Sequence, residues 1–185
     1  MTVVIKHTEI DGILMIQPQI YSDERGIFFE CFRVEDYRSV GIRENFVQEN
    51  ISRSKGGVIR GLHFQVNHPQ AQIVTVLTGS VFDVVVDLRP HSKTFGKWLG
   101  FELCGNSPMQ IYMAPGFAHG FYVSSEFAQL HYKVSRYYEP DDEGGLLWSD
   151  EELGILWPTK NPIVGLRDSA YPLLRELDAT NLPHA

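Results

Sequence analysis

The sequence predicts an all-β protein, folded as an antiparallel jelly roll or barrel. Short runs rich in Val, Ile, Phe and Tyr recur along the chain with Gly, Pro, Asn or Asp between them, at a spacing typical of sandwiches and barrels. Helix-forming patterns are scarce by comparison. Because the 185 residues contain no Ser-, Gly- or Pro-rich linker and 43% of them are hydrophobic, we expect a single domain over residues 1–185 with a substantial core.

Ten segments have the length and composition of strands, and turn-forming residues separate them. In chain order they are 13–17, 27–32, 46–52, 58–64, 73–77, 81–88, 98–103, 110–113, 120–123 and 128–135. One or two turns of helix are expected near residues 34–40, and a further helical stretch near the end of the chain. The run 81–88 is nearly all apolar, as in a strand covered on both faces, so its acids Asp83 and Asp87 need partners inside the fold.

The composition argues against several classes of partner. A formal net charge of -7 is unfavourable for a nucleic-acid-binding protein, so an anionic ligand would need a local basic pocket. We find neither the apolar core of a secretion signal nor a segment long enough to span a bilayer, which predicts a cytoplasmic protein without a membrane partner. With only two cysteines, a disulfide scaffold or a cysteine metal cage is not expected.

The segment Val-Ile-Arg-Gly-Leu-His-Phe-Gln, residues 58–65, is the most informative part of the chain. It places Arg60 three residues before His63, and side chains three apart on an ideal strand point to opposite faces. Gly61, between them, allows a bulge that would bring both toward one ligand. An isolated histidine of this kind is more often a hydrogen-bonded core residue. Here Tyr132, in another strand-like run, and Asp168, near the C-terminus, favour a base beside an anionic substrate.

Two further segments carry polar patterns. Around Arg25, the alternation of a strand puts Phe28 and Glu30 on one face, where an aromatic ring and a charge can hold a base and a phosphate. An ordinary edge strand with surface charges explains that segment equally well. Gln48, Asn50 and Ser52 are spaced by two, so they form a polar line on one strand face that is either solvated or binds hydroxyl groups.

Several motifs in order closely resemble the dTDP-4-dehydrorhamnose 3,5-epimerases. They are Arg-Gly-Ile-Phe-Phe-Glu (25–30), Gln-Glu-Asn-Ile-Ser-Arg-Ser (48–54), Arg-Gly-Leu-His (60–63), Val-Phe-Asp-Val-Val-Val-Asp-Leu-Arg (81–89), Thr-Phe-Gly-Lys-Trp (94–98), Pro-Gly-Phe-Ala-His-Gly-Phe (115–121), Tyr-Lys (132–133) and Trp-Ser-Asp (148–150). The likeness runs from about Tyr21 to Asp168. Any one of these motifs is weak evidence, but chance does not explain all of them in the same order.

The resemblance implies a cupin-type jelly roll that works as a homodimer and needs no metal or other cofactor. Its implied substrate is a nucleotide-linked 4-keto-6-deoxyhexose, whose ketone acidifies the hydrogens on C3 and C5. By their match to the family, His63 is the base, Asp168 orients it and stabilises its protonated form, and Tyr132 returns a proton from the opposite face.

The resemblance also assigns binding residues. Arg25 and Arg60 would hold the diphosphate, and Asp83 would support the pocket from behind it. The base or sugar would be held by further residues, some of them reached across the dimer: Phe28, Glu30, Gln48, Asn50 and Tyr138. His119 is expected to line the pocket as a substrate-binding residue. Gln72 departs from the family, which usually has a lysine there, and a neutral amide replaces a cation near the developing enolate only in part. This difference leaves open whether C3, C5 or both are inverted.

Three alternatives remain at this point. The first is an epimerase that inverts C3 only or C5 only on a different nucleotide sugar, such as a CDP- or GDP-linked one. The second is a metal-dependent cupin, with ligands drawn from His63, His68, His119 and His131, although Gln65 stands where such proteins usually have a second histidine. The third is a sugar-nucleotide binding module without catalysis, which would leave His63, Tyr132 and Asp168 without a role.

Overall fold

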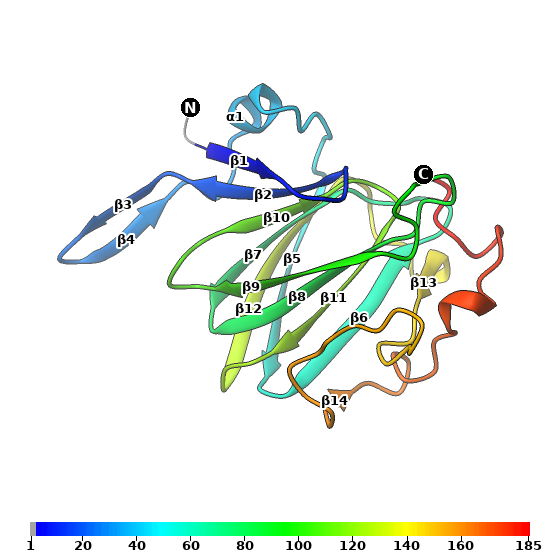
Figure 1. The fold of residues 1–185 in the computed structure, drawn as a ribbon. Coiled ribbons are helices and arrows are strands. Elements are labelled where there is room, and N and C mark those ends of the chain that lie inside the picture. Colours follow the sequence, from blue (N-terminus) through cyan, green and yellow to red (C-terminus); the bar gives the residue numbers. More distant parts are fainter. Residues whose placement is uncertain (1–2) are drawn as a thin grey trace.

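The computed structural model describes residues 3–185, and most of its strands lie in two antiparallel sheets that face each other (Figure 1). The first sheet has the order β1 (Val3–His7), β2 (Ile13–Pro18), β10 (Gln110–Met113), β7 (Gln72–Thr78), β12 (Phe127–Val134) and β5 (Gln48–Lys55). The second has the order β13 (Glu143–Gly145), β6 (Val58–Gln65), β11 (Phe117–Val123), β8 (Ser80–Asp87) and β9 (Trp98–Cys104). The short β14 (Ile163–Val164) pairs with β6 in parallel. The arrangement is a cupin-type jelly roll, as predicted.

Three clusters of buried apolar side chains hold the sheets in place. The central cluster lies between the sheets and joins residues of both, such as Val74 and Leu130 from the first and Val85 and Phe121 from the second. A second cluster covers the outer face of β8 with the C-terminal segment, and a third covers the outer face of the first sheet with the segment around α1 (Val34–Ser39). The pocket described below borders the central cluster at Phe121 and Tyr132.

The strand β8 is covered on both faces, as its apolar sequence predicts. Val81 and Val85 pack in the central cluster, whereas Val84 and Val86 pack in the cluster under the C-terminal segment. Its two acids have partners: Asp83 pairs with His119. Asp87 accepts hydrogen bonds from Arg89, Ser92 and Thr94.

Most predicted strands are present, and the differences fall at their ends. The strand expected over 27–32 is present as the shorter β4 (Gly26–Phe29). The strand expected over 46–52 is present as β5, which begins and ends further along the chain. The strand β11 begins three residues before its expected start at residue 120. Four further strands were not predicted from the sequence: β1, β3 (Ile20–Asp23), β13 and β14. Within the described residues, helix is confined to α1, as expected, and to two 3-10 turns, η1 (Pro140–Asp142) and η2 (Leu174–Glu176).

The strands β3 and β4 pair only with each other and form an arm, residues 20–29, that projects from the body of the molecule (Figure 1). The arm exposes large apolar side chains: Phe28 is 66% exposed and Tyr21 is 55% exposed. The rings of these two residues contact each other, with centroids 6.3 Å apart. Within residues 3–185, no helix combines the length and the apolar character needed to cross a bilayer.

Candidate active site

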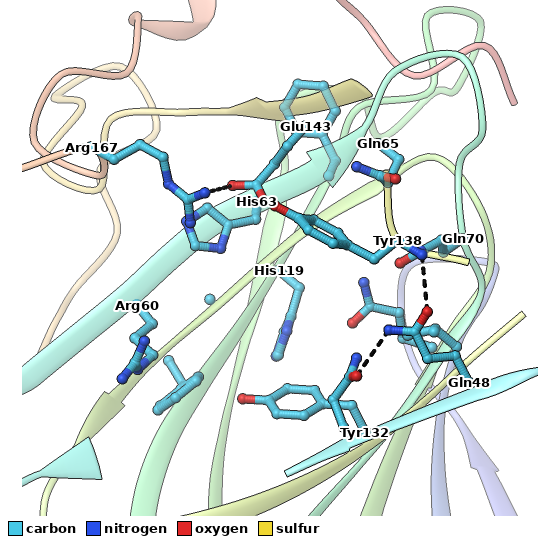
Figure 2. Close-up of a pocket in the computed structure, with 16 residues that line it drawn as sticks. Gln48, Arg60, His63, Gln65, Gln70, His119, Tyr132, Tyr138, Glu143 and Arg167 are labelled. Carbon is cyan, nitrogen blue, oxygen red and sulfur yellow. Dashed lines mark hydrogen bonds and ion pairs between the residues drawn. The ribbon is translucent and has the colours of Figure 1, made fainter. Parts of the chain in front are cut away.

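A cavity of about 380 Å³ opens between the two sheets, with side chains from both of them in its wall (Figure 2). Eight of the residues predicted for the site line it: Gln48, Asn50, Arg60, His63, Gln72, His119, Tyr132 and Tyr138. They come from five strands and from the segment after β12. The structure therefore gathers into one cavity most of the residues that the sequence singled out.

A bulge in β6 puts Arg60 and His63 on the same face. In the pairing of β6 with β11, His63 lies opposite His119 and Arg60 opposite Phe121, so Gly61 and Leu62 together face the single residue Gly120. Gly61 adopts φ +119°, a conformation that L side chains rarely adopt, and a Cβ on it would lie 2.5 Å from the Cα of Gly120. The predicted bulge is present, and it requires glycine because the two backbones are in close contact.

His63 is held by a carboxylate far away in the sequence. Its Nε2 lies 2.9 Å from Oδ1 of Asp168, which is buried. The other oxygen of Asp168 accepts a hydrogen bond of 3.1 Å from the backbone N–H of Gly61. Burial acts to raise the pKa of Asp168, but the hydrogen bonds from His63 and Gly61 and the charge of Arg167 outweigh it, so the pKa lies below its ordinary value. The bond to Asp168 occupies Nε2 of the imidazole and orients the ring, so that its other nitrogen is available to a ligand.

Tyr132 reaches the cavity from the opposite sheet. It lies on β12, and the neighbouring β5 turns Gln48, Asn50 and Ser52 to the same side, as the predicted polar line requires. Ser52 Oγ lies 3.1 Å from the Tyr132 hydroxyl. Burial raises the pKa of Tyr132, with a smaller contribution from the charge of Asp83, so its phenol keeps its proton at neutral pH. A protonated phenol facing a histidine from another sheet is suited to give up a proton on the side of a ligand away from that histidine.

His119 lies beside both of these groups. Figure 2 shows its ring between His63 and Tyr132, and its centroid is 6.2 Å from that of Tyr132. Its Nε2 lies 2.8 Å from Oδ2 of Asp83, a residue with no exposed surface. The cavity thus contains two histidines, each oriented by a buried carboxylate.

Two arginines make the cavity suitable for an anion. Arg60 donates a hydrogen bond to Ser54 Oγ and has no carboxylate partner within residues 3–185. Arg167 comes from the C-terminal segment and pairs with Glu143 at 2.9 Å (Figure 2). In a chain with a net charge of -7, Arg60 provides a local positive charge for an anionic ligand, whereas Glu143 offsets much of the charge of Arg167.

Four polar residues that line the cavity were not predicted from the sequence: Gln65, Gln70, Glu143 and Arg167. Strand alternation could have predicted Gln65, because it lies two residues after His63 and so points to the same face of the strand. Arg167 directly precedes Asp168 and lies in the same C-terminal segment. Glu143 had no local signal, because it follows a 3-10 turn and enters the site through the pairing of β13 with β6.

Three predicted binding residues do not lie in the cavity of their own chain: Arg25, Phe28 and Glu30. Arg25 and Phe28 are on the arm, and Arg25 is exposed and paired with Asp23. The expectation that Phe28 and Glu30 share a strand face is wrong, because β4 ends at Phe29 and Glu30 turns to form an ion pair with Arg33. Arg25 and Phe28 instead line a separate pocket on the arm itself.

The histidines considered as metal ligands are dispersed. His63 and His119 pair with different carboxylates, His131 pairs with Glu49, and His68 lies near Glu139. Over residues 3–185, no three His, Cys, Asp or Glu side chains are grouped as metal ligands. The donor arrangement does not fit the metal-dependent alternative, which expects several such ligands around one ion.

A jelly roll whose pocket sets a histidine–carboxylate pair against a phenol on the facing sheet defines a class of isomerase that removes and returns protons at carbon. The chain belongs to the dTDP-4-dehydrorhamnose 3,5-epimerase family, whose model matches residues 7–176. It is thus an epimerase of the kind that acts on sugars.

Relatives and solved structures agree with this assignment. The chain is 44% identical over 177 residues to dTDP-4-dehydrorhamnose 3,5-epimerase of Salmonella typhimurium, a match that covers 94% of this chain and 96% of the relative. It is 41% identical to dTDP-4-dehydrorhamnose 3-epimerase of Streptomyces niveus, over 94% of this chain and 86% of the relative. It resembles, with a TM-score of 0.95 and 44% identity, the crystal structure of dTDP-6-deoxy-D-glucose-3,5-epimerase from Legionella pneumophila in complex with dTDP-4-keto-L-rhamnose, over 99% of this chain and 98% of that one.

Proposed function

We propose that this protein inverts C3, C5 or both in a dTDP-linked 4-keto-6-deoxyhexose, with dTDP-4-dehydro-6-deoxy-D-glucose as the substrate, as a step of deoxysugar biosynthesis. The observation that carries the proposal is the placement of His63 and Tyr132 on facing sheets around one cavity. The names of relatives support the substrate class, since they describe epimerases of dTDP-4-dehydrorhamnose.

The proposed reaction begins with a proton on carbon. The ketone at C4 acidifies the hydrogens on C3 and C5, and His63, oriented by Asp168, accepts one of them as the enolate forms. Polar groups near the ketone stabilise the negative charge that develops on its oxygen, and His119 and Gln72 are the residues we assign to this task. Tyr132 then donates its proton to the opposite face of the same carbon, so the configuration is inverted.

We assign the nucleotide to the part of the cavity that Arg60, Gln48, Asn50 and Tyr138 line. Arg60 would bind a diphosphate oxygen, because its guanidinium is free of carboxylates and lies in the same cavity as the base. Gln48, Asn50 and Tyr138 would hold the nucleoside or the sugar. Asp83 acts from behind the pocket by holding His119.

We further propose that the protein works as a homodimer in which the arm of one subunit reaches the cavity of the other. Exposed Phe28 and Tyr21 on a projecting arm support this assembly, because such apolar surface is characteristic of contacts with another molecule. In this arrangement, Arg25, Phe28 and Glu30 would complete the binding site of the partner subunit. The cytoplasmic location expected from the sequence stays a prediction.

The direct test is exchange of carbon-bound hydrogen with solvent. The protein is incubated in heavy water with dTDP-4-dehydro-6-deoxy-D-glucose, and deuterium at C3 and C5 is followed by NMR, with CDP-, GDP- and UDP-linked keto-sugars in parallel. We expect deuterium at one or both carbons with the dTDP sugar, and its loss in His63→Ala. His91→Ala, which changes an exposed histidine outside the cavity, is the control. Undiminished exchange in His63→Ala would refute the assignment of the base, and no exchange with any sugar would favour a binding module.

A further inference from the structure

Tyr171 packs against the ring of His63 from outside the cavity. The two ring centroids are 5.7 Å apart and the planes are inclined at 66°, an edge-to-face contact. Tyr171 does not line the cavity itself, but an adjacent groove beyond it. The tyrosine is therefore placed to act on the histidine and not on a ligand.

The hydroxyl of Tyr171 is anchored to a residue of the cavity wall. It donates a hydrogen bond of 2.8 Å to Oε1 of Glu143, whose side chain is only 9% exposed. Arg167 pairs with the same oxygen at 2.9 Å, and the hydroxyl of Tyr138 donates to the other oxygen at 2.5 Å. Burial and the neighbouring carboxylate raise the pKa of Tyr171, so its hydroxyl stays a donor. One carboxylate thus connects Tyr171 with two residues of the cavity wall.

A glycine provides the space for this ring. Gly145 on β13 lies opposite His63 on β6, and a Cβ on Gly145 would lie 2.5 Å from ring atoms of Tyr171. Any larger residue would displace the aromatic ring from its position beside His63. The absence of a side chain at this position and the contact of the two rings are thus parts of one arrangement.

We propose that Tyr171 is a positioning residue for His63, an inference that rests on the proposed function of His63 as the base. Asp168 holds one nitrogen of the imidazole, and a single hydrogen bond leaves the ring free to tilt about that bond. The edge of Tyr171 limits this tilt from one side, and the bond to Glu143 fixes the tyrosine in turn. The orientation of the base is thereby linked to Glu143 and, through it, to Arg167 and Tyr138 in the cavity wall.

Two substitutions separate the effect of the aromatic ring of Tyr171 from the effect of its hydroxyl. In Tyr171→Leu the aromatic contact is lost, and we expect kcat for deuterium exchange to fall about 10- to 100-fold with KM within about twofold, because a small displacement of a catalytic group costs rate and not binding. In Tyr171→Phe the ring remains, and we expect kcat to return to within about threefold of the unmodified protein. Tyr112→Phe is the matched control, since Tyr112 also donates to a glutamate, Glu44 at 2.9 Å, but lies outside the cavity.

A spectroscopic measurement tests the proposal independently of activity. The NMR signals of the His63 imidazole protons are shifted by the nearby aromatic ring, so they should move in Tyr171→Leu and in Gly145→Ala and stay in place in Tyr171→Phe. A folded Tyr171→Leu with unchanged kcat and unchanged imidazole signals would overturn the proposal. So would a Tyr171→Phe as impaired as Tyr171→Leu. If the unmodified protein exchanges no hydrogen, the proposed function fails, and the imidazole signals still report whether Tyr171 positions the ring.

Discussion

Asp168 and His63 are 105 residues apart in the sequence, yet Oδ1 of the one lies 2.9 Å from Nε2 of the other. The second oxygen of Asp168 binds the backbone N–H of Gly61 inside the bulge of β6. The same carboxylate therefore has two effects. It stabilises the irregular backbone that turns His63 into the cavity, and it fixes the orientation of the imidazole ring. Loss of this carboxylate should affect both stability and catalysis.

The stability supplied by Asp168 should depend on pH. Because the pKa of Asp168 is lower in the folded protein than the ordinary value of about 4, its contribution is present above that value and is lost as the pH falls through the lower, folded-state pKa. We expect Asp168→Asn to lower the free energy of unfolding by about 1.5–3 kcal/mol at neutral pH, the usual range for hydrogen bonds to a charged group. Urea denaturation between pH 2 and pH 7 should show this difference shrink below about pH 4. A difference that is constant over the whole range would contradict the prediction.

Replacement of Gly61 should disrupt the bulge. Gly61→Ala combines an unfavourable φ, which costs about 1–2 kcal/mol, with a contact of 2.5 Å against the Cα of Gly120. Gly57→Ala is a matched control, because Gly57 also has positive φ, +79°, but nothing lies within 4 Å of its Cβ position. Thermal unfolding should show a clearly larger loss of stability for Gly61→Ala, together with loss of exchange activity. Equal losses in the two variants would mean that the close contact is unimportant.

Removal of the proposed acid should uncouple exchange from inversion. Tyr132→Phe leaves His63 and Asp168 in place, so deuterium should still enter the substrate from solvent. Formation of the inverted product should slow by about 10²- to 10⁴-fold, the range typical of general acid catalysis. NMR of the sugar distinguishes the two events in one experiment, with Tyr122→Phe, which lies outside the cavity, as the control. If inversion keeps pace with exchange in Tyr132→Phe, another group returns the proton.

The neutral residue at position 72 should limit the reaction. Gln72 lines the cavity, and the resemblance to the family implies a lysine at this position, a cation that would stabilise the enolate more strongly. We expect Gln72→Lys to raise the exchange rate at least about tenfold or to add exchange at a second carbon. Gln70→Lys places the same charge at a neighbouring position of the cavity and serves as the control. An unchanged or lower rate in Gln72→Lys would show that the pocket compensates in another way.

If the protein forms the proposed homodimer, mixed dimers test whether the arm of one subunit acts in the cavity of the other. Arg25→Ala and His63→Ala should each be nearly inactive alone. In a dimer with one copy of each, the subunit that keeps His63 would receive Arg25 from its partner, so activity should return when the two inactive proteins are mixed and allowed to exchange subunits. If Arg25 acts within its own chain, both sites of the mixed dimer are defective and activity stays absent. Analytical ultracentrifugation of each variant controls for loss of the dimer.

Local patterns in the sequence predicted much of this protein. The spacing of apolar runs indicated the jelly roll, and alternation placed Gln48, Asn50 and Ser52 on one face of β5. Gly61 indicated the bulge that joins Arg60 and His63 in one cavity. These predictions succeeded because side-chain direction along a strand follows from the covalent geometry of the chain.

The tertiary structure decided which of these faces meet. That Tyr132 lies across from His63, that Asp168 reaches Gly61, and that Glu143 connects Tyr138 with Tyr171 depends on pairing between strands and loops far apart in the chain. The position of Arg25 on a projecting arm, away from the cavity of its own chain, was likewise not readable from its motif. A motif defines the chemistry that a residue carries, whereas packing of the buried clusters around both sheets determines its neighbours.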